Sequence, residues 1–156
     1  MIFGIKPSTI LIRKAKYTIG YGINSLWNDK IHSGKGKKYL NEEENRWYCP
    51  HCFAKFIKIN QNLRYEEEIS RSCFLKTKNQ KILTLEFYKT KKVNPIFVFE
   101  EGVIKIGEYT LDLGRGYENK EDREVETIMK FGGTFIDVTS IHLKSRKSVK
   151  TTLKFD

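Results

Sequence analysis

The sequence has no apolar run long enough to cross a membrane, and its start, Met1-Ile-Phe-Gly, lacks the basic residues and long apolar stretch of a signal peptide. The 156 residues contain neither an internal repeat nor a low-complexity tract, so one compact domain is the default. Alanine is scarce while aromatic and β-branched residues are plentiful, which favours strands over helices. The chain is therefore expected to be cytoplasmic, on its own or as an internal piece of a larger protein.

Cysteine is also sparse, with Cys49, Cys52 and Cys73 as its three occurrences. An odd count without an export signal argues against a disulfide framework. The pair Cys49-Pro-His-Cys52 has the spacing of a redox motif, which needs its first cysteine at a helix N-terminus. Residues 53–59 alternate like a strand instead, so we expect no redox role.

A structural zinc site needs four ligands, normally two such pairs. The remaining candidates are Cys73, the sequence-distant His32 and His142, and His51, which lies between the two cysteines and is poorly placed to join them on one ion. The sequence thus supplies half a site, and we expect no metal. The simpler interpretation is that Cys49 and Cys52 bracket the entry to a strand and that one packs inward.

The net charge is +10, which favours binding to nucleic acid or to an acidic surface. The positive charges are spread along the whole chain, however, and lysines also protect sheet edges from pairing. Nucleic-acid binding is therefore an alternative rather than the main expectation. A membrane partner is not expected.

Most segments alternate with period two, as half-buried strands do. Short strands at this spacing predict an all-β protein, an eight-stranded antiparallel β-sandwich. A long loop at residues 24–45 is expected between the first two strands. The predicted strands lie at residues 17–23, 53–59, 66–75, 82–88, 103–113, 123–131, 134–141 and 149–155.

Catalytic motifs are missing. The stretch Ser33-Gly-Lys-Gly-Lys-Lys lacks the spacing of a phosphate-binding loop and the hydroxyl after its lysine. No Ser/His/Asp set stands out, and the three histidines are isolated in sequence. The chain is not expected to be an enzyme, and no cofactor is expected in it.

Several motifs occur in an order that resembles one family. They are Thr18-Ile-Gly-Tyr-Gly, the Arg46-Trp47 that ends the long loop, K-x-G-x-x-x-x-D-L at residues 105–113 and R-E-x-x-x-x-M-x-F-G at residues 123–132. The pattern resembles the peptide-binding β-domain of the seventy-kilodalton heat-shock proteins, most closely the atypical branch called family A member twelve. The resemblance covers nearly the whole chain.

The resemblance implies a fragment of a larger ATP-dependent protein. Residues 1–16 are similar to the end of an ATPase domain and its interdomain linker, and residues 17–156 to the β-sandwich peptide-binding domain. ATP would then be a cofactor of the full-length protein only. Unfolded or extended peptide segments are the implied partners, together with co-chaperones.

In such domains an extended peptide lies between two loops, and an apolar pocket accepts a side chain. By register with the family, Asn24 and Lys76 would arch over the peptide. The implied pocket residues are Tyr21, Ile23, Cys73, Leu83, Leu85 and Val125. Two alternatives stay open: an interaction module for one fixed partner, and a nucleic-acid-binding β-domain. The strand residues could equally be sandwich core.

Overall fold

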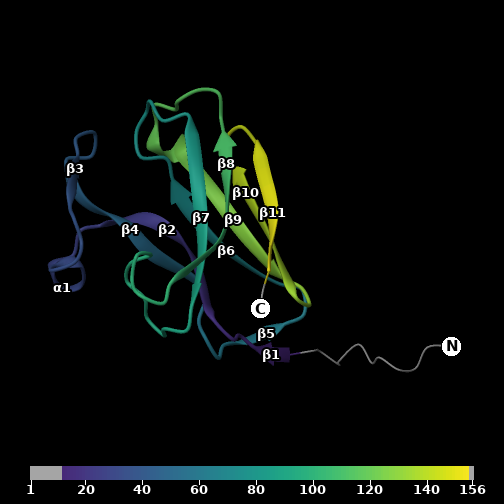
Figure 1. Cartoon of the computed structure of the whole chain (residues 1–156). Coiled ribbons are helices and arrows are strands. Elements are labelled where there is room, and N and C mark those ends of the chain that lie inside the picture. The colour runs from purple at the N-terminus through teal and green to yellow at the C-terminus, as the bar shows by residue number, and fades with distance from the viewer. Residues whose placement is uncertain (1–11, 155–156) are drawn as a thin grey trace.

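Two antiparallel sheets pack face to face in the computed structural model, which describes residues 12–154 (Figure 1). A five-stranded sheet has the order β3-β4-β2-β7-β8, and a four-stranded sheet has the order β11-β10-β9-β6. The first sheet contains β2 (Thr18–Leu26), β3 (Tyr39–Asn41), β4 (Arg46–Ile57), β7 (Ile82–Thr90) and β8 (Ile104–Asp112). The second contains β6 (Glu67–Phe74), β9 (Glu124–Phe131), β10 (Phe135–His142) and β11 (Ser148–Lys154).

The alternation in the sequence decides which side chains fill the space between the sheets. In β9 the residues at alternate positions, Val125, Thr127, Met129 and Phe131, are all buried, while their neighbours are more exposed. The central cluster joins such residues from both sheets, because period-two side chains share one face of a strand. The all-β sandwich expected from the sequence is confirmed.

The predicted number of strands was wrong, because the described residues contain eleven strands rather than eight. Each of the eight predicted strands is present, and the second is extended backwards to form β4 (Arg46–Ile57). The three additional strands are only three residues long: β1 (Ile12–Lys14), β3 and β5 (Asn62–Arg64). Strands β1 and β5 pair with each other as a separate ribbon.

The predicted junction at residues 1–16 lies mostly outside the described residues. Its last part forms β1, and the following Ala15 is buried in the central cluster. The division into a linker and a sandwich domain therefore stays a prediction.

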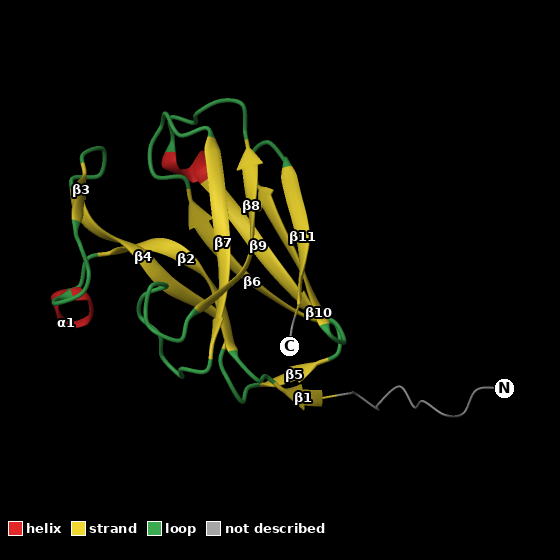
Figure 2. Ribbon diagram, viewed as in Figure 1, coloured by secondary structure: helices red, strands yellow, loops and turns green. Residues whose placement is uncertain are grey.

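The predicted long loop contains regular structure. Its middle part forms helix α1 (Asp29–His32) and strand β3, and it returns to the sheet through β4. We call residues 27–48 the arm, because they extend away from the two packed sheets on the left in Figure 2. A second short helix, η1 (Lys120–Arg123), precedes β9. Neither helix in the described part of the chain has the length or apolar character needed to span a bilayer.

Candidate functional site

A groove lies between the arm and the loop that connects β6 to β7. It has a volume of about 260 Å³ and receives side chains from β2, the β3–β4 hairpin, β6, β7 and η1. The lining residues are Gly22, Ile23, Asn24, Tyr39, Asn41, Glu44, Tyr48, Ser72, Cys73, Phe74, Leu75, Lys76, Leu83, Thr84, Leu85 and Lys120. Apolar and polar groups are segregated within this set.

The floor of the groove is apolar. Leu85 belongs to the central cluster, and Leu75 belongs to a second buried cluster together with Val125. Cys73 and Leu83 are partly buried and pack against both clusters. The floor is therefore supported from below by packed core and should hold its shape.

The wall on the arm side is aromatic. Tyr39 of β3 and Tyr48 of β4 are directly paired across the hairpin, and their rings stack at 6.0 Å between centroids. The ammonium group of Lys76, from the opposite loop, lies 5.3 Å from the centre of the Tyr39 ring. This cation–π contact joins the two sides of the groove.

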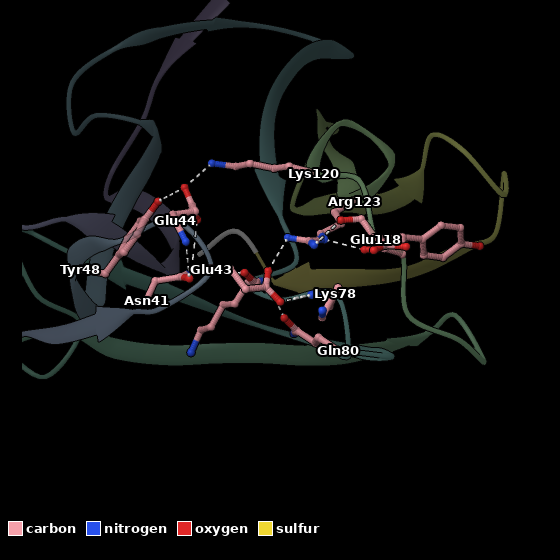
Figure 3. Close-up of polar contacts among 11 residues, drawn as sticks. Asn41, Glu43, Glu44, Tyr48, Lys78, Gln80, Glu118, Lys120 and Arg123 are labelled. Atoms are coloured by element: carbon pink, nitrogen blue, oxygen red, sulfur yellow. Dashed lines mark hydrogen bonds and ion pairs between the residues drawn. The ribbon is translucent and has the colours of Figure 1, made fainter.

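Polar contacts tie the turn of the hairpin to the sandwich, as Figure 3 shows. We call Asn41, Glu43 and Glu44 the turn latch. The Asn41 amide donates to the carbonyl oxygen of Lys76 at 3.3 Å, and the backbone N–H of Lys78 donates to Glu43 at 3.0 Å. Both contacts reach the β6–β7 loop, so the latch joins the hairpin turn to the loop on the opposite side of the groove.

Two cations of the η1 segment complete the latch. Lys120 donates to the Glu44 carboxylate at 2.7 Å, and buried Arg123 pairs with Glu43 at 3.2 Å (Figure 3). The guanidinium also donates to the carbonyl oxygens of Tyr117 and Glu118, both at 2.7 Å. Because two hydrogen bonds to backbone carbonyl oxygens fix its guanidinium, Arg123 positions Glu43 rather than merely neutralising it.

Glu44 is ionised in this setting. Burial opposes its charge, but hydrogen bonds from Lys120 and from the Tyr48 hydroxyl outweigh burial and lower the pKa of the carboxyl. Burial and the same Glu44 contact raise the pKa of Tyr48 to about 12, so the phenol remains a donor at neutral pH.

The structure brings most of the predicted site residues together. Ile23, Asn24, Cys73, Lys76, Leu83 and Leu85 line the groove. Tyr21 and Val125 do not: they are 1% and 0% exposed and lie in the core below it. The Tyr21 hydroxyl is hydrogen-bonded to Cys73, whose thiol pKa burial raises to about 12.

The arm side of the groove was missed by the sequence analysis. Tyr39, Asn41, Glu44 and Tyr48 line it, and Lys120 reaches it from η1. A signal was present, because Tyr-Leu-Asn and Arg-Trp-Tyr flank a polar Glu-Glu-Glu-Asn turn, as in a hairpin. Asn45 has a φ of 53° in that turn, a conformation that asparagine tolerates.

One group of potential metal ligands occurs among the described residues, and it lies outside the groove. His32 of α1 approaches Cys49 and Cys52 of β4. The strand predicted after Cys52 is present, and burial raises the pKa of the Cys49 thiol to about 11. This shift is opposite to the depressed pKa of a reactive thiol.

Known proteins resemble this chain over almost its full length. Heat shock 70 kDa protein 12A of Mus musculus is 31% identical over 157 residues, which cover 99% of the chain and 23% of that protein. The Homo sapiens protein of the same name gives the same identity and coverage. Heat shock 70 kDa protein 12B of Homo sapiens is 25% identical over 162 residues, with 99% and 23% covered.

The chain is a homologue of the heat shock 70 kDa protein 12 branch. The family resemblance drawn from the sequence motifs is thereby confirmed, although no family model matches the chain. The chain spans about a quarter of the length of these curated relatives.

Proposed function

We propose that the groove binds an extended, apolar peptide segment, as in a substrate-binding domain of a heat-shock-like protein. The observation that carries the proposal is the separation of β2 and β7. These neighbouring strands pair from Thr18 with Thr90 up to Tyr21 with Phe87, and the pairing ends there. Beyond Tyr21, β2 stays paired with β4, and the first half of β7 stays paired with β8.

Within residues 12–154, two unpaired strand edges therefore face each other across the gap. A second hollow of about 230 Å³ adjoins the groove and shares Gly22, Ile23, Asn24, Lys76 and Thr84 with it. Free backbone donors and acceptors along such edges recruit an extended chain, and pockets for alternate side chains supply selectivity. The gap with its apolar floor has the features needed to hold a peptide in this way.

The test is a titration of a fluorescently labelled leucine-rich peptide with the whole chain, monitored by anisotropy. Leu83→Trp fills the groove, and we expect it to weaken binding about tenfold or more, which corresponds to a loss of about 1.4 kcal/mol. The matched control is Ile82→Trp, because Ile82 is 48% exposed and its side chain points to the opposite face of β7. Circular dichroism checks that both variants fold.

Equal affinity of Leu83→Trp and Ile82→Trp would contradict the groove assignment. Binding of one defined sequence, with no tolerance for other apolar peptides, would favour the fixed-partner alternative. Affinity for single-stranded nucleic acid that falls steeply with salt, with no peptide binding, would favour the nucleic-acid alternative.

We also infer that the chain itself does not hydrolyse ATP. The glycine–lysine stretch after Ser33 runs into β3 rather than into a helix, as a phosphate-binding loop would. A Cβ atom on Gly36 would lie 3.0 Å from the Cys49 sulfur. This glycine is therefore explained by the close packing of the loop on Cys49, and it need not bind a phosphate. Calorimetry with Mg-ATP should give no binding heat, and saturable binding would contradict the inference.

A further inference from the structure

His32, Cys49 and Cys52 converge in a small apolar cluster between α1 and β4. Their exposed fractions are 5%, 0% and 4%, and their potential ligand atoms all lie within 4.8 Å of one another. Phe97 packs against both cysteines, and the rings of Trp27 and Phe97 flank the imidazole. Three groups that prefer a polar partner or a metal are thus enclosed by apolar surface.

A β-bulge directs both sulfur atoms to the same place. In a regular strand, residues three apart point to opposite faces. Cys49 and Cys52 of β4 pair with Ser25 and Ile23 of β2. The pair in β4 is three residues apart and the pair in β2 only two, so β4 contains one extra residue. His51 takes a φ of 60°, an uncommon conformation outside glycine, to make this possible. The strand is distorted in a way that pairs the thiols.

The segment between β2 and β3 brings His32 to the two cysteines and covers them. The Asn28 side chain caps α1 by accepting from the Lys30 N–H at 2.9 Å, which fixes the helix that carries His32. The loop after α1 covers Cys49 closely, because Gly36 has no Cβ to strike the sulfur. The Lys37 backbone is hydrogen-bonded to Cys49, so the loop also contacts this sulfur directly.

We propose that His32, Cys49 and Cys52 bind one Zn²⁺ ion, which tethers α1 to the bulge in β4 and so braces the arm. A tetrahedral zinc ion lies about 2.3 Å from a cysteine sulfur and about 2.0–2.1 Å from a histidine nitrogen. A sulfur and a nitrogen bound to the same zinc ion are therefore about 3.6 Å apart. Cys52 Sγ and His32 Nε2 are 3.6 Å apart. The sequence spacing indicated Cys49 and Cys52 as two possible ligands, and the fold brings His32 to them as the third.

The charge of the loaded site suits its apolar surroundings. Two thiolates and one neutral imidazole cancel the charge of Zn²⁺, so no net charge is buried. On binding, two S–H bonds break, two Zn–S bonds form and two protons pass to solvent. Among the described residues no fourth histidine, cysteine or carboxylate joins the three. The fourth position is therefore available to water or to a ligand from outside the described residues.

Metal binding requires the imidazole to exchange its proton. Asn28 N–H donates to His32 Nδ1 at 2.9 Å, so the hydrogen of the neutral ring is on Nε2 and faces Cys52. With zinc on Nε2, the hydrogen moves to Nδ1, and the Asn28 N–H loses its acceptor. The Asn28 amide is consequently a local reporter of metal binding.

The experiment is a titration of the reduced, chelator-treated chain with Zn²⁺, and with Co²⁺ as a spectroscopic substitute. We expect one equivalent to bind with release of two protons, sulfur-to-cobalt charge-transfer absorption, and a shift of the Asn28 amide resonance. We expect a large loss of zinc affinity in each of three variants, Cys49→Ala, Cys52→Ala and His32→Leu. The loss should exceed the roughly 10–100-fold that follows when a residue hydrogen-bonded to a metal ligand is removed. Cys73→Ala is the matched control and should bind as the unmodified chain does.

Failure of the reduced chain to bind Zn²⁺ would overturn the proposal, and this result needs no variant to fold. Binding that survives Cys49→Ala and Cys52→Ala, or that is lost in Cys73→Ala, would overturn it as well. A Cys49–Cys52 disulfide in the isolated protein, with no zinc uptake after reduction, would show a redox pair instead. No peptide is present in the titration, so the result does not depend on the function proposed for the groove.

Discussion

In the sandwich, large side chains such as Tyr21, Phe87 and Phe131 are almost fully buried and pack in one continuous cluster. The arm has no comparable core. Its position depends on the polar contacts of the turn latch and on the small cluster of Cys49, Cys52 and Phe97. Ionic and sulfur-containing contacts respond to pH, salt and metals, whereas apolar packing hardly does. The groove, whose wall is the arm, can therefore change while the sandwich stays folded.

The largest effect is expected in the sandwich. Phe87→Ala removes a ring that is 0% exposed and should lower the free energy of unfolding by about 3–5 kcal/mol, measured by urea denaturation. Phe135→Ala is the control, since this ring is 52% exposed and its loss should cost within about 0.5 kcal/mol. Similar losses in the two variants would mean that the sandwich core has been misidentified.

A smaller effect is expected when the latch loses one of its two cations, Arg123. Arg123→Met removes the ion-pair partner of Glu43 and the side-chain donor to two carbonyl oxygens, and it should cost about 2 kcal/mol. Hydrogen exchange of residues 41–44 should accelerate more than exchange in β9. The exposed Arg115 provides the control substitution Arg115→Met. Unchanged exchange in the turn would show that Arg123 does not hold the turn in place.

Acid should release the latch before it unfolds the sandwich. The pKa of Glu44 is lowered in the folded chain, so its stabilising effect is complete above the unfolded pKa and is lost as pH falls through the folded pKa. We expect the Tyr48 NMR signals to shift at a pH below the ordinary pKa of a glutamate carboxyl, because the pKa of Glu44 is lowered. Glu44→Gln should abolish this transition, and Glu66→Gln, at an exposed carboxyl, should keep it.

The smallest effect concerns the basic rim of the groove. Lys76 and Lys120 line it, so peptides with acidic flanks should bind about two- to fivefold more tightly at low salt than peptides with neutral flanks. Lys76→Gln should reduce this preference, whereas Lys91→Gln, an exposed lysine that does not line the groove, should not. A preference that is unaffected by salt would show that charge at the rim plays no part.

Much of the fold was predictable because long strands carry a period-two signal. The three short strands were not, since three residues are too few to establish a period. The arm has no regular pattern in its sequence for a related reason: β3 is short, and the four residues of α1 cannot show a helical repeat. Its position comes from tertiary contacts such as those of Glu43 and Arg123, which are far apart in sequence.

The floor of the groove was predictable and its wall was not. Alternation shows which face of a strand points inward, but it cannot separate a groove residue such as Leu83 from a core residue such as Val125. The cysteine cluster had a similar limit. Spacing revealed Cys49 and Cys52, whereas His32 reaches them only because α1 folds back against the bulge.

The most direct test of the account is a comparison of one labelled leucine-rich peptide with its backbone N-methylated form. N-methylation removes the peptide N–H groups that the open edges of β2 and β7 would bind, and it leaves the apolar side chains in place. Methylation at alternate residues should weaken binding about tenfold or more. Equal affinity of the two peptides would show that the open strand edges do not hold the ligand and would contradict the central claim.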